Sequence, residues 1–325
     1  MNEKCTLYLV VPCYNEQEVL TETNRQLLEK MTSLMERGVI HEKSRILYVN
    51  DGSKDQTWIL IRKFHGENVI CSGLTLSRNR GHQNAVLAGL MYAKEHCDVA
   101  ITLDADLQDD INAVDQMIEK YYEGCDIVYG VRSARDTDTF FKRFTAEAFY
   151  KLINKISDAD IVDGARDFRL MKRDMVDAIV EMNEYNRFSK GIFGWIGFRT
   201  YWLPYQNVER VAGETKWSFW KLFKYALDGI INFSQVPLSL ASYGGIILTF
   251  VSFAAIIFVI VRRLLFGDPV DGWPSLVCII TFIGGIQLFC MGIMGQYLSK
   301  TYLESKHRPH YIVSESNVED PVKIH

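Results

Sequence analysis

The sequence predicts an α/β fold with a mostly parallel sheet, followed by a transmembrane pair of helices. Over residues 1–236, short apolar runs alternate with longer amphipathic ones, which is the pattern of strands and crossover helices. Two later runs, Leu238–Val261 and Trp273–Leu298, contain no charged residue. Each is longer than the roughly 20 residues that a helix needs to cross a hydrocarbon core.

Strands and helices are expected to alternate along the first part of the chain. The strands are predicted at residues 7–11, 45–49, 69–76, 99–103 and 127–131, and the helices at 18–36, 57–64, 83–95 and 111–122. No G-x-G-x-x-G follows any of these strands. The pattern therefore indicates a nucleotide-binding α/β fold but disfavours the dehydrogenase version.

The late apolar runs are interpreted as a membrane hairpin, with a pair of buried core helices as the alternative. Basic residues flank the outer ends of the hairpin at Arg210, Lys216, Lys221, Lys224, Lys300, Lys306 and Arg308, whereas the connecting loop carries Arg262 and Arg263 beside Asp268 and Asp271. This distribution predicts a multi-pass protein of the inner or plasma membrane, with both ends and the catalytic domain in the cytosol.

Several protein classes are disfavoured by composition. The apolar run near the start is too short for a signal peptide. The net charge of −4 argues against a nucleic-acid partner. The seven cysteines form no C-x-x-C pair, so we expect them to be reduced packing residues. The tail after about Pro309 is expected to be loosely ordered.

Polar clusters follow four of the predicted strands. In an open α/β sheet the carboxyl ends of the strands form the ligand crevice, so residues just after strands are the first candidates for chemistry. The clusters are Pro12-Cys-Tyr-Asn-Glu16, Asn50-Asp-Gly-Ser53, Ser77-Arg-Asn-Arg-Gly-His-Gln83 and Asp104-Ala-Asp-Leu-Gln108.

Asp104, Asp106 and Gln108 offer hard oxygen ligands for Mg²⁺ or Mn²⁺ held jointly with a substrate diphosphate. Such a metal would neutralise charge on a departing nucleotide diphosphate. Asp-x-Asp alone also fits a solvated turn, and Asp109 and Asp110 fit a helix start. Taken singly, Asn50-Asp-Gly-Ser53 likewise fits an ordinary Asx turn.

The order of the motifs resembles family 2 glycosyltransferases that act on polyprenyl phosphates, the dolichyl-phosphate mannosyltransferase and undecaprenyl-phosphate glucosyltransferase group. The motifs are V-P-C-Y-N-E at 11–16, N-D-G-S at 50–53, L-S-R-N-R-G-H-Q at 76–83, D-A-D-L-Q at 104–108, Y-G-V-R at 129–132 and D-F-R-L-M at 167–171. The resemblance is collinear over nearly the whole chain. It departs at Asn50, where many relatives have Asp, and at Asp109-Asp110, where D-P is frequent.

The resemblance implies a GT-A catalytic domain and a set of site residues. Metal ligands would be Asp104, Asp106 and Gln108. Catalytic residues would be Asp167, Arg132, Arg169 and Arg210. The nucleotide sugar would be bound by Pro12, Tyr14, Asn15, Glu16, Asp51, Arg78, Gln83, Asp104 and Ala105.

Residues 210–216 resemble the family's acceptor segment R-x-x-G-[ED]-[ST]-K. Arg210 and Lys216 would bind the lipid phosphate, and positive-inside anchoring is the alternative reading of both charges. Trp217–Phe233 is predicted to lie flat on the bilayer. Phe140–Ile156 fits either that role or a surface helix of the core. The predicted domains are 1–209 for GT-A, 210–236 for the acceptor segment and interfacial helix, 237–299 for the hairpin and 300–325 for the tail.

The expected reaction is an inverting transfer of a hexose to polyprenyl phosphate, with UDP-glucose as the first candidate and UDP-N-acetylglucosamine, UDP-galactose and GDP-mannose open. A phosphate monoester has a second pKa of about 6, so the acceptor is already mostly ionised and needs no strong base. Asp167 could therefore orient Arg169 or the acceptor instead of removing a proton.

A processive polysaccharide synthase is disfavoured because Q-x-x-R-W is missing. An inactive sugar-nucleotide-binding anchor is the non-enzymatic alternative. Glycines 244, 245, 284, 285, 292 and 295 are compatible with a homo-oligomer.

Overall fold

The computed structural model describes residues 4–132, 165–182, 184–185, 187, 189–205, 231, 234, 236–266 and 272–318. The chain divides into two compact units, one built around a sheet and one around two long helices. Residues from Arg308 onward belong to the sheet unit. Each unit is described separately below.

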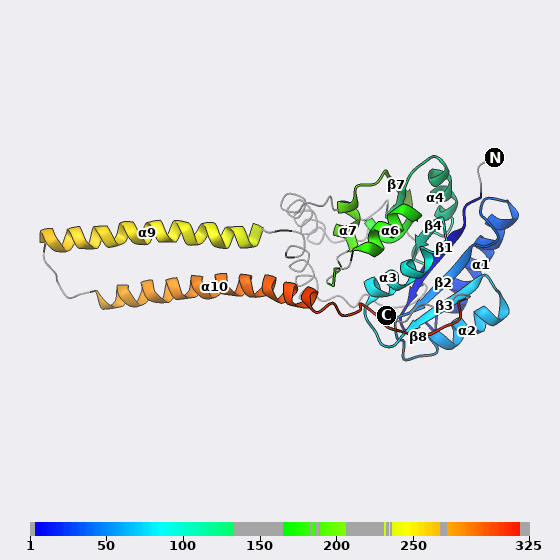
Figure 1. Ribbon diagram of the computed structural model, residues 1–325, viewed down its shortest axis with the longest axis horizontal. Coiled ribbons are helices and arrows are strands. Elements are labelled where there is room, and N and C mark those ends of the chain that lie inside the picture. The colour runs from blue at the N-terminus through cyan, green and yellow to red at the C-terminus, as the bar shows by residue number, and fades with distance from the viewer. Residues whose placement is uncertain are drawn as a thin grey trace. The chain divides into compact units, whose positions relative to one another are not determined.

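The sheet unit has eight strands and six labelled helices within the described residues (Figure 1). The elements in chain order are β1 Leu7–Cys13, α1 Leu20–Glu36, β2 Arg45–Asn50, α2 Thr57–Glu67, β3 Cys71–Leu76, α3 His82–Ala93, β4 Val99–Thr102, α4 Ala113–Tyr122, β5 Ile127–Arg132, β6 Ala165–Lys172, α6 Arg173–Glu181, α7 Ser189–Ile196, β7 Thr200–Tyr205 and β8 Val313–Ser316.

The strand order is β7-β5-β6-β4-β1-β2-β3-β8. Strands β4, β1, β2 and β3 are parallel, as are β5 and β7. Strand β6 is antiparallel to both of its neighbours, β4 and β5. The prediction of a mostly parallel α/β sheet is confirmed, and the predicted strands and helices are present with ends that differ by a few residues.

The strands are apolar because helices cover both faces of the sheet. In β1, Leu7, Leu9 and Val11 pack in a core with helices α1, α2 and α4. Tyr8 and Val10 point to the opposite face and pack with α3, α6 and α7. A strand that is buried on both faces has a continuous run of apolar residues, and this run allows the strand at 7–11 to be predicted from the sequence.

The expectation of a loosely ordered tail is wrong for the residues up to 318. Strand β8 pairs antiparallel with β3, and Val313 is 6% exposed in the core beside it. Ser77 N donates to Ile312 O at 2.8 Å, and Asn317 N donates to Gly73 O at 3.0 Å. The sequence gives little indication of this strand, because Val313 is the one apolar residue of β8. The strand is held by backbone hydrogen bonds, which do not depend on a side-chain pattern.

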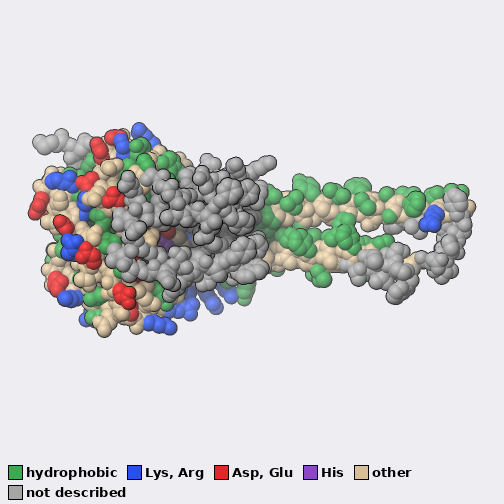
Figure 2. Space-filling view, turned by 180° about the vertical axis from the view of Figure 1, so that it is seen from behind, with side chains coloured by type: hydrophobic (Ala, Val, Ile, Leu, Met, Phe, Trp, Pro, Cys, Tyr) green, Lys and Arg blue, Asp and Glu red, His purple; other side chains and the backbone are tan. Residues whose placement is uncertain are grey.

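The second unit contains α9 Val236–Phe266 and α10 Trp273–Ser305. Two segments, Val236–Ala255 and Phe282–Ser305, are long and apolar enough to cross a membrane, with mean hydropathies of 1.7 and 1.2. Neither segment is buried, and Figure 2 shows hydrophobic side chains along the outside of both helices. Exposure on this scale does not fit core helices and fits a transmembrane hairpin.

Both helices run past the predicted spans, α9 by five residues to Phe266 and α10 by seven to Ser305. The hydroxyl of Tyr297 donates to Ser234 O at 2.6 Å within this unit. The space around Gly244, Gly284 and Gly292 is open, so close packing through them stays a prediction. Phe140–Ile156 lies outside the described residues, as does Trp217–Phe233 apart from Ile231.

Candidate functional site

The polar clusters meet at one edge of the sheet. Strands β3, β2, β1 and β4 are adjacent and parallel, so their carboxyl ends lie together. The four clusters each follow one of these ends. The predicted crevice edge is therefore built from four neighbouring strands, with the antiparallel β6 beside β4 adding Asp167 and Arg169.

Asp51 follows β2 and is 2% exposed. Its Oδ1 accepts the amide of Arg80 at 2.7 Å and its Oδ2 accepts the amide of Gly81 at 2.9 Å. Burial raises the pKa of Asp51, while the two amide donors oppose that rise. The carboxylate thus holds the loop between β3 and α3, and its predicted contact with a nucleotide stays a prediction.

Gly52 lets the backbone pass beside that loop. Its φ is +63°, and a Cβ placed on it would lie 2.4 Å from the carbonyl carbon of Arg78. A side chain at this position would meet backbone atoms that cannot rotate away. The turn therefore requires glycine both for its dihedral angle and for space.

The loop after β1 is joined to the loop after β2. Asn15 has a φ of +56°, its amide donates to Ser53 Oγ at 2.9 Å, and its Oδ1 accepts the amide of Lys54 at 2.9 Å. The amide of Glu16 donates to Thr57 Oγ1 at 3.0 Å. Asn15, predicted to bind the nucleotide, therefore has a structural role in shaping this loop.

Asn50 also has a structural role. Its Nδ2 donates to Thr75 Oγ1 at 2.6 Å, and its Oδ1 accepts the amide of Ser53 at 3.2 Å. An aspartate would lack the Nδ2 donor that reaches Thr75. With asparagine at this position, Thr75 is the acceptor of the side-chain bond between β2 and β3.

The loop after β4 is shaped by its own backbone and by α1. The hydroxyl of Thr23 donates to Ala105 O at 2.7 Å, and the amide of Gln108 donates to Asp106 Oδ1 at 3.2 Å. Leu107 has a φ of +56°, a left-handed conformation that is uncommon for leucine. A backbone held in this way is pre-shaped before any ligand binds, and Asp104, Asp106 and Gln108 stay partly exposed along it.

The two acids that follow have different surroundings. Asp109 is 4% exposed and accepts a hydrogen bond from the hydroxyl of Tyr205 in β7 at 2.5 Å. Asp110 Oδ1 accepts the amide of Asn112 at 2.9 Å, as expected of a residue near a helix start. The helix-start interpretation fits Asp110, whereas Asp109 tightens the contact between the β4 loop and β7.

His82 was not predicted as a site residue, and the structure places it at the centre of the site. Its Nε2 lies 3.0 Å from Asp167 Oδ2 and 3.8 Å from Asp104 Oδ1. Gln83 Nε2 lies 3.5 Å from Asp167 Oδ2. The available signal was the position of His82 directly before Gln83, at the first residue of the helix that begins beside the crevice.

Arg169 holds the other side of Asp167. Its Nη2 donates to Asp167 Oδ1 at 2.6 Å, and the side chain is 2% exposed. The guanidinium carbon lies 3.7 Å from the centroid of the Phe193 ring and 5.4 Å from that of Tyr129. A group this buried does not reach a substrate in this conformation, so its geometry fits a positioning role better than the predicted catalytic one.

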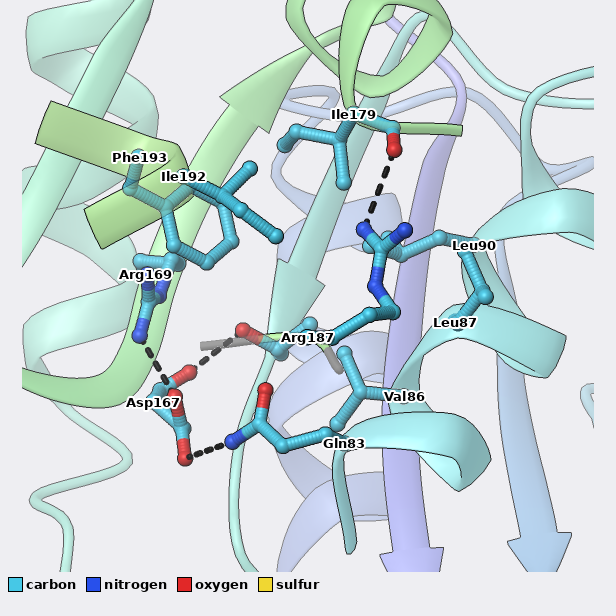
Figure 3. A pocket seen from close by; sticks show the side chains of 11 residues that line it. Gln83, Val86, Leu87, Leu90, Asp167, Arg169, Ile179, Arg187, Ile192 and Phe193 are labelled. Atoms are coloured by element: carbon cyan, nitrogen blue, oxygen red, sulfur yellow. Dashed lines mark hydrogen bonds and ion pairs between the residues drawn. The ribbon is translucent and has the colours of Figure 1, made fainter. Parts of the chain in front are cut away.

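A small cavity lies behind Asp167 and Arg169, among α3, α6 and α7 (Figure 3). Its volume is about 20 Å³, which is room for roughly one water molecule. Arg187 borders it and caps α6, because its Nη2 donates to Ile179 O at 3.0 Å and its Nη1 to Met182 O. The cavity is too small for a sugar.

The charges at the crevice edge perturb one another. Burial lowers the pKa of His82, but the hydrogen bond to Asp167 and the charge of Asp104 outweigh it and raise that pKa to about 9. Burial and, to a smaller extent, the charges of Asp109, Asp167 and Asp106 raise the pKa of Asp104 to about 6, although the charge of His82 opposes the rise. Perturbed acids and bases in a crevice are typical of functional sites.

The donors near Asp104 fit a divalent cation in their chemistry. Two carboxylates and an amide oxygen are hard ligands. Burial and then repulsion by neighbouring acids raise the pKa of Asp104, and a bound cation would relieve that repulsion. Among the described residues no group of three His, Cys, Asp or Glu side chains is arranged around one point. Substrate oxygens or water would have to complete the coordination, as is usual for Mg²⁺.

The remaining predicted residues are only partly described. Pro12 is buried at the end of β1, while Tyr14 is 42% exposed beyond it and Arg78 is exposed after β3. Arg132 ends β5, and its side chain is not described. The predicted acceptor residues Arg210 and Lys216 lie outside the described residues.

The chain is similar in sequence to known glycosyltransferases. The model of glycosyl transferase family 2 matches residues 8–180. The chain is 45% identical over 307 residues to the glycosyltransferase YkoT of Bacillus subtilis, covering 94% of this chain and 90% of that protein. It is 40% identical over 309 residues to the glycosyltransferase sll0501 of Synechocystis, with 95% of each chain covered.

A third relative is the prophage bactoprenol glucosyl transferase homolog of Escherichia coli. It is 42% identical over 308 residues, covering 94% of this chain and 97% of that protein. The chain belongs to glycosyl transferase family 2, and its sheet unit has the GT-A type of mixed α/β fold.

Proposed function

We propose that this protein transfers a hexose from a nucleotide-diphosphate sugar to a polyprenyl phosphate, with UDP-glucose and undecaprenyl phosphate as the first candidates. The observation that carries the proposal is the convergence of Asp104, His82 and Asp167 at the carboxyl edge of the sheet. The two apolar helices support a lipid substrate, and so do relatives named as bactoprenol glucosyl transferases in Escherichia coli and Shigella flexneri.

The donor would bind along the ends of β1 to β4, with its diphosphate next to Asp104. Asp104, Asp106 and Gln108 would hold Mg²⁺ or Mn²⁺ there. When bound, the cation would supply charge neutralisation for the departing nucleotide diphosphate. The loop bonds of Asn15, Asp51 and Thr23 keep this edge in one shape before the donor arrives.

The acceptor phosphate would attack the anomeric carbon opposite the leaving group and invert that centre. It is mostly dianionic at neutral pH because its second pKa is about 6, so a strong base is not required. Asp167 is bonded on both oxygens by Arg169 and His82. This fits an orienting carboxylate. The imidazolium of His82 partly offsets the repulsion between the approaching anions.

The reaction would take place at the cytosolic face of the inner or plasma membrane, with the hairpin crossing the bilayer twice. The product would be a lipid-linked hexose. Such a lipid could donate its hexose for the modification of cell-envelope glycans.

Incubating the purified full chain in lipid nanodiscs with radiolabelled nucleotide sugars tests the proposal. UDP-glucose, UDP-N-acetylglucosamine, UDP-galactose and GDP-mannose would each be offered with undecaprenyl or dolichyl phosphate. We expect label in the extractable lipid, abolished by EDTA and restored by Mg²⁺ or Mn²⁺. Donor hydrolysis without lipid labelling, or donor binding without either, would contradict the proposal.

A further inference from the structure

His82 lies between the two carboxylates that the proposed function uses for different tasks. Its Nε2 is 3.0 Å from Asp167 Oδ2 and 3.8 Å from Asp104 Oδ1. An ionised carboxylate only accepts hydrogen bonds, so the imidazole must donate its Nε2 proton to Asp167. The imidazole therefore connects the reaction centre with the proposed metal-binding loop.

The two oxygens of Asp167 are held from different elements. Arg169 on β6 donates to Oδ1 at 2.6 Å, and His82 on α3 donates to Oδ2 at 3.0 Å. Arg169 is fixed by burial and by the Phe193 ring, whereas the His82 side chain is 38% exposed. One oxygen of Asp167 is thus held by a buried residue and the other by a partly exposed one.

His82 is itself placed by the loop that Asp51 holds. The amides of Arg80 and Gly81 are bound by the buried Asp51 carboxylate, and α3 begins at the next residue. The position of the imidazole is therefore set by β2 as well as by α3.

We propose that His82 is a positioning residue that fixes the orientation of Asp167 relative to Asp104, so that acceptor and donor meet in line. This inference rests on the proposed function. It assigns His82 a role in turnover more than in donor affinity, because His82 Nε2 lies next to Asp167 and Asp104.

The test compares His82→Ala, His82→Gln and Asp167→Asn in the lipid-transfer assay. We expect His82→Ala to lower kcat by about 10- to 100-fold, with the donor KM changed by less than about threefold. His82→Gln keeps an N–H donor and should recover most of that loss. Adding His82→Ala to Asp167→Asn should cost less than the product of the two single losses, because Asp167→Asn already weakens the hydrogen bond that His82→Ala removes. His96→Ala, a half-buried histidine bonded to Tyr92 O, is the matched control and should be unaffected.

Three results would overturn the role: unchanged kcat in His82→Ala, equal losses in His82→Ala and His82→Gln, or losses that multiply in the double variant. Should His82→Ala fail to fold, His82→Met and His82→Gln give the comparison, since only glutamine donates, and equal activities would overturn it.

A readout without turnover separates this inference from the proposed function. In ¹⁵N-histidine NMR spectra of the wild type, we expect a hydrogen-bonded Nε2–H signal for His82 that shifts in Asp167→Asn. An unshifted signal would overturn the positioning role even in an active enzyme. A wild type that labels no lipid would contradict only the proposed function.

Discussion

Arg169 and Asp167 form a charge pair in which the cation is 2% exposed and the Nη2–Oδ1 distance is 2.6 Å. Arg25 and Glu22 on the surface of α1 have the same 2.6 Å separation, with side chains 60% and 44% exposed. Because the two pairs have the same distance but different exposure, comparing them tests how burial changes the contribution of a charge pair to stability.

Arg169→Met should lower the free energy of unfolding by about 1–3 kcal/mol, since the partly exposed Asp167 carboxylate loses a charged hydrogen-bond donor but keeps His82. It should also reduce lipid transfer by at least about tenfold, because Oδ1 of Asp167 loses the buried donor that holds it. Thermal unfolding and kcat are the measurements. Arg25→Met is the control and should leave the unfolding midpoint unchanged. Equal shifts in the two variants would show that burial of Arg169 adds nothing.

Gly52→Ala should destabilise the protein and weaken donor binding. The alanine Cβ would lie 2.4 Å from backbone of Arg78, and the φ of +63° is unfavourable for alanine, which together cost about 1–3 kcal/mol. Gly66→Ala in α2 is the control, because nothing lies within 4 Å of its added Cβ. Alanine is also the better helix former, so that variant should be neutral or slightly stabilised. A Gly52→Ala chain with wild-type stability and donor Kd would contradict the close approach.

Much of the fold could be predicted because β1 to β4 are buried on both faces and read as plain apolar runs. Strand β6 was recognised only as the motif Asp167-Phe-Arg-Leu-Met171, because Asp167 and Arg169 within it obscure a strand pattern. Arg169 is buried against Tyr129 and Phe193, which come from β5 and α7. No local property of the sequence indicates such a pairing across elements.

The sequence predicts which loops meet at the site better than it predicts what each side chain contacts. Asp104 and Asp167 do lie near one another, both within reach of His82. Asn15 and Asp51 instead bind backbone amides of neighbouring loops. An Asn or Asp after a strand can face a ligand or satisfy its own turn, and only coordinates distinguish the two. His82 was missed because its partners lie on β6 and after β4, distant in sequence.

The stability of the protein should depend on the ionisation of His82. Its pKa is raised from 6.5 to about 9, so folding favours the cation. The resulting stabilisation is complete below pH 6.5 and is lost as pH rises through about 9. The unfolding midpoint of the wild type should therefore exceed that of His82→Gln at pH 6.5, and the difference should shrink by pH 9. A difference in unfolding midpoint that stays the same from pH 6.5 to pH 9 would show that the imidazole is not charged in the folded state.

The tail strand should be needed for donor binding. Strand β8 holds β3 just before the loop that Asp51 binds, and Glu315 Oε2 accepts a hydrogen bond from Trp58 Nε1 at 2.9 Å. We expect deletion of residues 309–325 to raise the donor Kd and lower the unfolding midpoint. A synthetic peptide of residues 308–318 should restore part of both by adding a strand to the exposed edge. Deletion of residues 319–325 alone is the control, and full activity after the longer deletion would contradict this.

The acids after β4 are proposed to bind a divalent cation for sugar transfer to a polyprenyl phosphate. Mn²⁺-dependent labelling of undecaprenyl phosphate from radiolabelled UDP-glucose, measured for the wild type and for Asp106→Ala, tests this proposal. We expect labelling by the wild type that EDTA abolishes, and a loss of at least about 100-fold in Asp106→Ala. Transfer by Asp106→Ala at the wild-type rate, with the same metal dependence, would contradict it.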